Sequence, residues 1–288
     1  MAVQDSLQNV VGSIDAVRQS VAQARLRKAV VGLVPTMGAL HRGHEELIAR
    51  ARSQCDFVVV SIFVNPLQFG PREDFASYPR TLAEDAAVCS NHSVDLIFAP
   101  EVRELYGDSG ESTRVIPPAA LINRLCGTFR PGHFEGVATV VAKLFNIVGP
   151  DRAFFGLKDF QQLQVIRHLV RDLDFPIEII GVPTVREESG LALSSRNKYL
   201  TGDQKELAPA LSKALRSVAV RVAGGEDVAA VLSSEKANLE CTGFRVQYLE
   251  VCRPDSLEPL ASVTGEAVVL VAAHLGDVRL IDNLQFAI

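Results

Sequence analysis

The alternation of strand-like and helix-like segments is the feature that most constrains the fold of this chain. Residues Ala29 to Val34 are rich in β-branched side chains, and Phe57 to Val64 form a near-continuous apolar run. Such a run is typical of a strand that is buried on both faces. A helical pattern from Gly43 to about Gln54 lies between the two, and Val94 to Phe98 read as the following strand. This alternation predicts a parallel sheet with helices on both faces.

The same pattern continues to about residue 183. It predicts a helix over Phe134 to Val148, a strand over Arg152 to Phe155, a helix over Lys158 to Asp172 and a strand over Ile177 to Val182. The segment Thr81 to Glu84 has the Thr-x-x-Glu spacing of a capping box and should open another helix. We therefore expect a doubly wound α/β domain whose ligands bind at the carboxyl ends of the strands.

The pattern changes after Pro183, where helices come first and strands follow. The expected helices are Asp203 to Ala223 and Asp227 to Leu239, and the expected strands are Arg245 to Val251, Ala267 to His274 and Val278 to Phe286. Helices followed by strands predict a smaller α+β domain. We place the domains at residues 1–183 and 184–288.

The composition excludes several classes of protein. The net charge is −5 without a basic block, which argues against a nucleic-acid partner. No run of about twenty apolar residues predicts a membrane span, and the N-terminus has no signal-peptide pattern. The five cysteines include no Cys-x-x-Cys pair, so we expect neither a zinc ribbon nor a disulfide framework. This usage favours a reducing, cytoplasmic setting.

A histidine pair, His41 and His44, follows the first predicted strand and opens a helix. Helix N-termini bind anions through unpaired N–H groups, and Gly38 and Gly43 would let the backbone approach a ligand. Zinc is a weak alternative, because Ile48 stands where a His-Glu-x-x-His motif needs its second histidine. Phosphate binding, acid/base chemistry and simple loop polarity all remain open at this point.

Other predicted strand ends carry polar groups as well. Asn65 and Gln68 offer amides that suit hydroxyls and carboxylates, although, for this segment taken alone, an Asn-Pro turn with a solvent-facing glutamine is the favoured interpretation. A Gly-rich loop carries Arg130 and His133, and a lone histidine of this kind is more often structural than catalytic. Together these groups suit an anionic ligand.

Two further segments add positive charge. Lys158 can act as a point charge for phosphate, with Gln162 one turn later on the same helical face. The segment Ser194-Ser-Arg-Asn197 includes Arg196, which could pair bidentately with phosphate, although such a segment is often just a surface turn. No Walker loop or Gly-x-Gly-x-x-Gly fingerprint is present, so the P-loop and dinucleotide-binding classes have no support.

The motifs resemble, in order along the chain, those of the pantothenate synthetase (pantoate–β-alanine ligase) family, which belongs to the nucleotidyltransferases with a His-x-Gly-His signature. They are Pro35 to His44, Phe63 to Phe69, Tyr78 to Thr81, Arg130 to Phe134, Gly156 to Gln162 and Ser194 to Asn197. The resemblance implies a Rossmann-like sheet and a two-step reaction. Pantoate and ATP would give pantoyl adenylate and pyrophosphate, and β-alanine would then give pantothenate and AMP. It also implies Mg²⁺ and a homodimer.

Carried over by position, the resemblance assigns roles to individual residues. His44 would be the proton donor, with His41, Lys158 and Arg196 beside the phosphates. The implied ATP contacts are Met37, Gly38, Ala39, Leu40, His41, Arg42, Gly43, His44, Gly156, Leu157, Lys158, Asp159, Val185, Leu193, Ser194, Ser195 and Arg196. Gln68 and Gln162 would hold pantoate, with Asn65 and His133 as secondary substrate contacts. Glu84 and Asp85 would lie near the metal, although Glu84 also has the expected capping role.

Two positions depart from the family pattern. Leu193 replaces a common Met, a nearly volume-conserving change that should keep a nucleotide contact. Ser189 replaces a common Asp and leaves the conformation of the 186–190 loop open. A related nucleotidyltransferase for another substrate, or a non-catalytic nucleotide-binding protein, are the competing hypotheses. The first would transfer a nucleotide without consuming β-alanine, and the second is disfavoured by the intact His41, His44, Lys158 and Arg196.

Overall fold

The computed structural model describes residues 9–71, 73, 75–108 and 112–288, and its chain divides into two compact units. The first comprises residues 1–157 and 165–183, and the second comprises residues 158–164 and 184–288. Among the described residues, no helix has the length and apolar character that crossing a bilayer requires.

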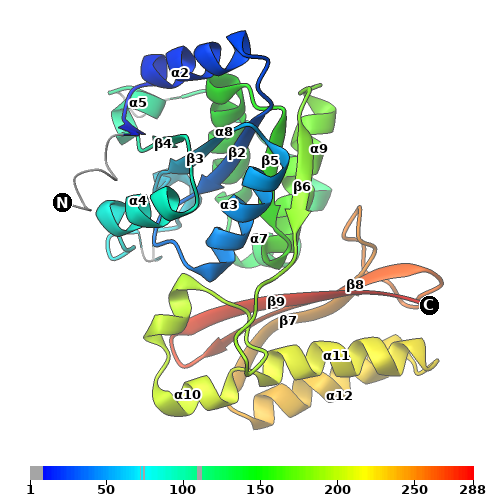
Figure 1. Ribbon diagram of the computed structural model, residues 1–288. Coiled ribbons are helices and arrows are strands. Elements are labelled where there is room, and N and C mark those ends of the chain that lie inside the picture. The colour runs from blue at the N-terminus through cyan, green and yellow to red at the C-terminus, as the bar shows by residue number, and fades with distance from the viewer. Residues whose placement is uncertain (1–8, 72, 74, 109–111) are drawn as a thin grey trace. The chain divides into compact units, whose positions relative to one another are not determined.

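The first unit is built on a parallel sheet of six strands within the described residues (Figure 1). The strand order is β1-β4-β3-β2-β5-β6, and every neighbouring pair is parallel. The strands are β1 (Val10–Val11), β2 (Val31–Thr36), β3 (Phe57–Ile62), β4 (Leu96–Phe98), β5 (Arg152–Gly156) and β6 (Glu178–Val182). The chain runs outward from β2 to β3 and β4, and then continues on the opposite side of β2 with β5. The strand order therefore reverses at β2, where ligands of such sheets bind.

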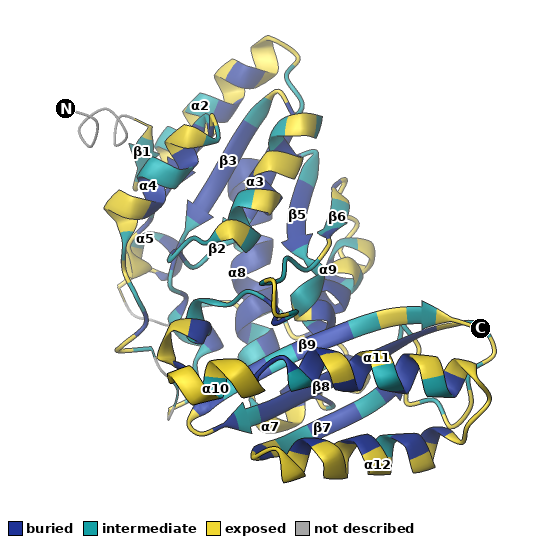
Figure 2. Cartoon of the chain, turned by 60° about the horizontal axis from the view of Figure 1, so that its bottom comes forward, coloured by how far each residue is buried: buried dark blue, intermediate teal, exposed yellow. Residues whose placement is uncertain are grey.

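Helices cover both faces of this sheet (Figure 1). Helices α3 (Arg42–Gln54) and α4 (Leu82–Asn91) pack on one face, and α2 (Ile14–Leu26) and α8 (His133–Val148) pack on the other. The α3 side chains Leu47, Ile48 and Ala51 meet Val34, Val58 and Val60 of the strands in one buried cluster. Because α8 is apolar on nearly all sides, it is enclosed along most of its length (Figure 2). The doubly wound fold expected from the sequence is confirmed.

Short elements and one long helix complete the polypeptide up to Val182. They are η1 (Pro66–Gln68), α5 (Val102–Tyr106), α6 (Ala119–Ile122), α7 (Cys126–Phe129), η2 (Leu157–Asp159) and α9 (Phe160–Asp172). The expected helix over Lys158 to Asp172 thus begins with a 3₁₀ turn before α9. The two-residue strand β1 and the short helices α5, α6 and α7 have too little periodicity to be predicted from the sequence.

The second unit has a three-stranded antiparallel sheet in the order β7-β8-β9 and two long helices. Its elements are η3 (Ser195–Tyr199), α10 (Gly202–Leu207), α11 (Ala210–Ala223), α12 (Val228–Cys241), β7 (Phe244–Cys252), β8 (Glu266–Leu275) and β9 (Val278–Ala287). Val269, Val271 and Ala273 of β8 share a buried cluster with Leu215 and Val218 of α11. The expected α+β character is confirmed.

Two local predictions were wrong. The single helix expected over Asp203 to Ala223 is divided into α10 and α11, because Pro209 lacks the N–H group that a continuous helix needs. Thr81 is the N-cap of α4, but its side chain makes no capping hydrogen bond. The hydroxyl instead donates to the Asp85 carboxylate at 3.2 Å, so the capping box with Glu84 does not form.

Candidate functional site

The loop between β2 and α3, residues 37–41, is closed by a capping box that the two histidines make between them. His41 is the N-cap of α3, and its Nδ1 accepts a hydrogen bond from the Gly43 N–H at 3.0 Å. The Nδ1 of His44 accepts from the His41 N–H at 3.3 Å. The two rings lie 4.2 Å apart, centroid to centroid, at 41°. Each imidazole thus satisfies a backbone donor at the helix start.

These hydrogen bonds fix the tautomer of both rings. A backbone N–H can only donate, so Nδ1 of His41 and of His44 must each be the unprotonated acceptor nitrogen. In the neutral ring the proton then lies on Nε2, which makes each imidazole a hydrogen-bond donor at its outer nitrogen. Both side chains are partly exposed. A phosphate oxygen is the type of acceptor that such a pair of donors suits.

The backbone amides of this loop are largely used inside the protein. The Ala39 and Leu40 N–H groups donate to Asp85, and the His44 N–H donates to the His41 carbonyl at 2.7 Å. The predicted role of Gly43 also changes, because a Cβ at this position would lie 2.8 Å from Cε1 of His41. Gly43 therefore makes room for the imidazole, and the donors that the loop offers to a ligand are its side chains.

The loop after β3 carries Asn65 and Gln68, which the structure brings together. Asn65 is fully buried and is the N-cap of η1. Its Oδ1 accepts from the Tyr106 hydroxyl at 2.8 Å and from the Leu67 N–H at 3.3 Å. Its Nδ2 donates to the Gly136 carbonyl at 3.0 Å and to Oε1 of Gln68 at 2.9 Å. Four hydrogen bonds therefore use the whole capacity of the Asn65 side chain.

Asn65 determines which end of the Gln68 amide faces outward. The Leu67 N–H can only donate and the Gly136 carbonyl can only accept, so the orientation of the Asn65 amide is fixed. Its remaining N–H must meet an acceptor, which is Oε1 of Gln68. The Nε2 group of Gln68 is consequently the end that can contact a ligand. It is a donor only, so it selects an acceptor oxygen.

His133 and Arg130 hold the backbone of Gln68. The carbonyl of Gln68 accepts from Nδ1 of His133 at 2.8 Å and from Nη2 of Arg130 at 3.3 Å. Because Nδ1 donates, Nε2 of the neutral His133 ring accepts the 3.0 Å hydrogen bond from Nη1 of Arg130. Glu73 anchors the guanidinium in turn, at 2.8 Å from Nε and 2.7 Å from Nη2. Burial opposes ionisation of Glu73, but the hydrogen bonds from Arg130 outweigh it and lower the pKa of this carboxyl.

Helix α8 approaches this loop closely. A Cβ on Gly136 would lie 2.2 Å from the Leu67 carbonyl oxygen, which no side chain could tolerate. Glycine at this position therefore lets η1 lie directly on the helix backbone, where Asn65 reaches the Gly136 carbonyl.

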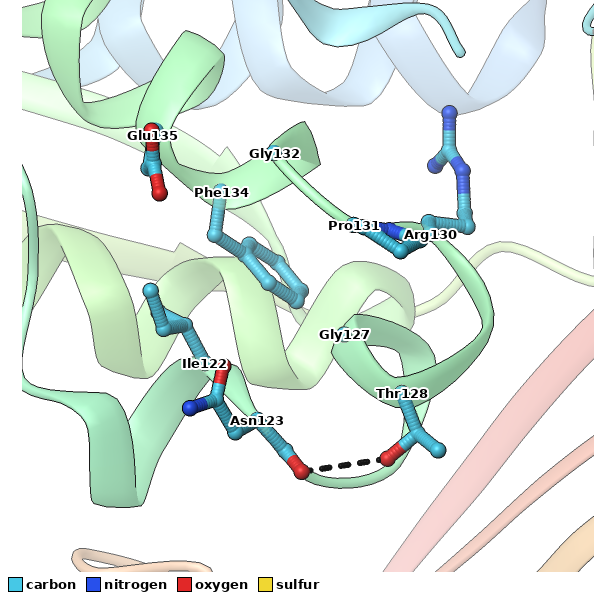
Figure 3. Close-up of a pocket in the computed structure, with 9 residues that line it drawn as sticks. All are labelled: Ile122, Asn123, Gly127, Thr128, Arg130, Pro131, Gly132, Phe134 and Glu135. Carbon is cyan, nitrogen blue, oxygen red and sulfur yellow. Dashed lines mark hydrogen bonds between the residues drawn. The ribbon is translucent and has the colours of Figure 1, made fainter.

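A cavity of about 320 Å³ lies beside Arg130 and Gly132 (Figure 3). Ile122 and Phe134 contribute apolar surface, and the Thr128 hydroxyl donates to the Asn123 carbonyl at 3.1 Å. Figure 3 shows the Arg130 side chain extending away from Ile122 and Asn123. Its charge is directed to Gln68 and Glu73 rather than into this cavity.

The second unit brings together several of the predicted nucleotide contacts. The Leu193 N–H donates to the Val185 carbonyl at 3.0 Å, and the Leu193 carbonyl accepts from Nζ of Lys158 at 2.8 Å. Ser194 caps η3 by accepting from the Arg196 N–H at 3.3 Å. Leucine in place of the common methionine is compatible with this arrangement, because both contacts of Leu193 use its backbone.

The 186–190 loop, whose conformation the sequence did not predict, is a tight turn. The Gly190 N–H donates to the Glu187 carbonyl at 2.8 Å, and the Glu187 N–H donates to the Leu191 carbonyl at 2.8 Å. The Ser189 hydroxyl accepts from the Leu191 N–H at 3.4 Å. Serine thus provides an acceptor in this turn, as aspartate would.

Lys158 has the environment of a functional amine. Burial lowers the pKa of its ammonium group, Asp159 and Asp282 oppose this shift, and Arg196 and Arg186 reinforce it. Asp282 itself is neutralised by Arg186 through two hydrogen bonds of 2.6 and 2.9 Å. A partly buried lysine beside other cations is stabilised in its charged form when an anion binds next to it.

Gln162 is partly buried in α9. The other predicted nucleotide contacts, Gly156, Leu157, Asp159 and Ser195, lie in β5, η2 and η3. The roles carried over to all of these residues remain predictions.

Two supporting residues could not be found from the sequence. Tyr106 and Glu73 lie 41 and 57 residues along the chain from the side chains they hold. No local motif marks such partners, because only the tertiary fold brings them to Asn65 and Arg130.

The comparisons with known proteins agree on one family. The family model described as "Pantoate-beta-alanine ligase" matches residues 9–285. The pantothenate synthetase of Pseudomonas savastanoi pv. phaseolicola is 52% identical over 278 residues, covering 96% of this chain and 98% of the relative. That of Acinetobacter baumannii is 50% identical over 275 residues, with 96% and 97% covered.

Solved structures extend the likeness to the fold. The crystal structure of pantothenate synthetase from Thermus thermophilus has a TM-score of 0.90 and 48% identity, covering 96% of this chain and 99% of that one. A pantoate–β-alanine ligase from Francisella tularensis has a TM-score of 0.80 and 37% identity, with 96% of each chain covered. The crystal structure of that ligase is of a complex with "Beta-gamma ATP and Beta-alanine".

Proposed function

This chain belongs to the pantoate–β-alanine ligase family, and on that premise we propose that it condenses pantoate and β-alanine to pantothenate, using ATP. The match spans residues 9–285, and identity of about half over 96% of the chain extends through every motif that carries the site. The beta-gamma ATP and β-alanine in the complex of the Francisella tularensis relative support the same substrates here.

The reaction follows from the chemistry of a carboxylate, which is a poor acyl donor. A carboxylate oxygen of pantoate attacks the α-phosphorus of ATP, the new P–O bond forms and pyrophosphate leaves. The amine of β-alanine then attacks the acyl carbon of pantoyl adenylate, the C–O bond breaks and AMP leaves with the original carboxylate oxygen. The amine loses a proton as the amide forms. Positioning and stabilisation of phosphate charge supply most of the catalysis.

The capped histidine loop is the observation that carries this function. His41 and His44 are both neutral Nε2–H tautomers, because each Nδ1 accepts a backbone hydrogen bond. We assign them the role of hydrogen-bond donors to phosphate oxygens of ATP, where negative charge develops as pyrophosphate leaves. For His44 this role is a refinement of the proton-donor prediction, since a second proton on Nδ1 would break the capping box.

Gln68 supplies the complementary selection of pantoate. Its Nε2 donates to an acceptor oxygen of the substrate, since Oε1 is already held by Asn65. Asn65 and His133 were predicted as substrate contacts, and their observed partners support a different role for both. We assign them to positioning Gln68, one through its side chain and the other through its carbonyl. Gln162 remains the second proposed pantoate contact.

The nucleotide contacts of the second unit remain proposals. Lys158 and Arg196 provide charges suited to phosphate, while Val185, Leu193 and Ser194 form the adjoining backbone. We propose that ATP binds as its Mg²⁺ complex, with the ion held mainly by the nucleotide phosphates, as Mg²⁺ prefers. The homodimer implied by the resemblance is likewise a proposal, and sedimentation velocity measures it. The five free thiols support a reducing, cytoplasmic compartment.

A product assay tests the function. The protein is incubated with pantoate, β-alanine and Mg-ATP, and AMP and pantothenate are quantified; equal amounts of the two are expected. A second reaction without β-alanine should release pyrophosphate up to about one equivalent per site and then stop. Continuous nucleotide transfer without β-alanine would instead indicate a nucleotidyltransferase for another substrate. The absence of all products from folded protein that binds ATP would refute the ligase function.

A further inference from the structure

Asp85 is a buried carboxylate that accepts hydrogen bonds from two amides of the loop at residues 37–41, here called the histidine loop, and from Thr81, the N-cap of α4. It sits in the first turn of α4, and only 2% of its surface is exposed. Oδ1 accepts from the Leu40 N–H at 2.7 Å, and Oδ2 accepts from the Ala39 N–H at 3.0 Å. The Thr81 hydroxyl donates to Oδ2 at 3.2 Å. Both oxygens are therefore engaged by hydrogen bonds from within the protein.

The backbone of the loop is shaped to present these amides to one anion. Gly38 and Ala39 both have positive φ, at 81° and 51°, and the N–H groups of the next residue in each case, Ala39 and Leu40, reach the same carboxylate. A Cβ at Gly38 would lie 2.9 Å from Oδ2 of Asp85 and 3.1 Å from Ile62. The closeness of the carboxylate leaves little room for a side chain at Gly38, and glycine adopts the positive φ without strain.

The buried carboxylate of Asp85 and its three hydrogen-bond donors depend on one another, because each would be left without a partner if the other were removed. Burying a carboxylate is unfavourable unless donors replace its water, and three donors do so here. Removal of the carboxylate would leave the Ala39 and Leu40 amides without a partner. His41 follows Leu40 directly, so the position of the histidine pair depends on this anchor.

The metal role implied for Glu84 and Asp85 does not fit this geometry. Glu84 is exposed, whereas Asp85 is buried with both oxygens occupied. In the described part of the chain, no group of three or more His, Cys, Asp or Glu side chains is arranged to hold a metal ion. Two adjacent positions of a helix also point about 100° apart, which separates their carboxylates.

We infer that Asp85 is a positioning residue, a fixed internal anion that holds the loop before His41 and His44, and that it is not a ligand of the magnesium ion. This inference deepens the proposed function, on which its catalytic consequence rests. It also explains why the amides of Ala39 and Leu40 are not available to phosphate, so that the imidazoles provide the loop's contacts with ATP.

The discriminating variants are Asp85→Asn and Glu84→Gln. An asparagine keeps one acceptor oxygen, but its NH₂ group faces a backbone N–H and leaves one amide unpaired. We expect the rate of adenylate formation to fall by about 10-fold or more in Asp85→Asn, as for a lost buried acceptor. The Mg²⁺ concentration for half-maximal activity should stay as in the wild type for both variants. A several-fold increase in that concentration, with the rate restored by excess Mg²⁺ or Mn²⁺, would identify a metal ligand and overturn the inference.

Two measurements test the anchor without using activity. Long-range ¹H–¹⁵N spectra of the imidazoles should show Nε2–H tautomers for His41 and His44 in the wild type and in Glu84→Gln, but a mixture in Asp85→Asn. Native-state hydrogen exchange of the wild type should show protected Ala39 and Leu40 amides, which covers the case in which Asp85→Asn fails to fold. Rapid exchange at both amides, or unchanged spectra in a folded Asp85→Asn, would contradict the inference. Failure of the ligase function alone would leave both measurements as expected.

Discussion

The two loops that follow β2 and β3 are each held by a buried side chain, which is charged in the first loop and neutral in the second. The histidine loop is held by a charged group, the Asp85 carboxylate, which takes up backbone amides. The Gln68 loop is held by the neutral amide of Asn65, which takes up a side-chain oxygen. In the first loop, backbone N–H groups then satisfy Nδ1 of each imidazole, and in the second Asn65 satisfies Oε1 of Gln68. In both cases the other end of the functional side chain is a donor. The comparison teaches that the supporting residues decide whether a functional side chain presents a donor or an acceptor to the substrate.

The largest effect is expected from His44→Ala, which removes a phosphate donor and half of the capping box. Adenylate formation should fall by about 10²-fold or more, in the range for loss of a preorganised donor. His44→Asn separates the two losses, because asparagine can still accept from the His41 N–H but has no imidazole Nε2. Single-turnover release of pyrophosphate measures both. A rate for His44→Asn near that of the wild type would show that His44 only caps the helix and does not donate to phosphate.

The next effect concerns the polarity of Gln68. Gln68→Glu keeps an acceptor for Asn65 but offers a charged acceptor where the substrate requires a donor. We expect the KM for pantoate to rise by about 10- to 100-fold, because a mispaired buried polar group weakens binding by roughly 1–3 kcal/mol. The KM for ATP should change much less. Steady-state kinetics with each substrate varied in turn provides the measurement, and equal changes in both constants would contradict the assignment.

A double-mutant cycle tests whether Asn65 acts through Gln68. Asn65→Ala alone should raise the KM for pantoate by about 10-fold, because Oε1 of Gln68 loses its buried donor and the amide is no longer held in one orientation. In the Gln68→Ala background the same change should have little further effect, since contacting residues are non-additive. Tyr106→Phe is the matched control, because it removes a hydrogen bond to Asn65 Oδ1 without touching the Gln68 bond. If the changes in KM of the two single variants instead add in the double variant, Asn65 acts independently of Gln68, as a direct substrate contact would.

The smallest effect is on stability and concerns Glu73. Its folded-state pKa lies below the unfolded value near 4.5, so its ion pair stabilises the fold above that pH. The contribution is lost as the pH falls through the lowered folded value. Glu73→Gln should therefore reduce the free energy of unfolding by about 1 kcal/mol at neutral pH and by progressively less in acid. Urea unfolding at pH 7 and pH 3 measures this, and an equal difference at both values would exclude the ion pair as its source.

Much of the fold and part of the site could be predicted from the sequence. The doubly wound sheet follows from alternating apolar runs, and the positions of His41, His44 and Gln68 follow from where those runs end. The supporting role of Asp85 could not be predicted, because Thr81 and Glu84 matched a local motif, while the loop amides that Asp85 binds lie 45 and 46 residues away in the sequence. Gly43 was expected to let the backbone approach a ligand, but it makes room for His41, because the orientation of that imidazole cannot be read from the sequence.

The path of a single oxygen atom tests the ligase mechanism most directly. Pantoate labelled with ¹⁸O in its carboxylate is incubated with β-alanine, Mg-ATP and the protein, and the AMP is analysed by mass spectrometry. The account predicts one ¹⁸O atom in the phosphate of each AMP, because the attacking carboxylate oxygen leaves with the nucleotide. Unlabelled AMP, or ADP and phosphate in place of AMP and pyrophosphate, would contradict a pantoyl adenylate intermediate.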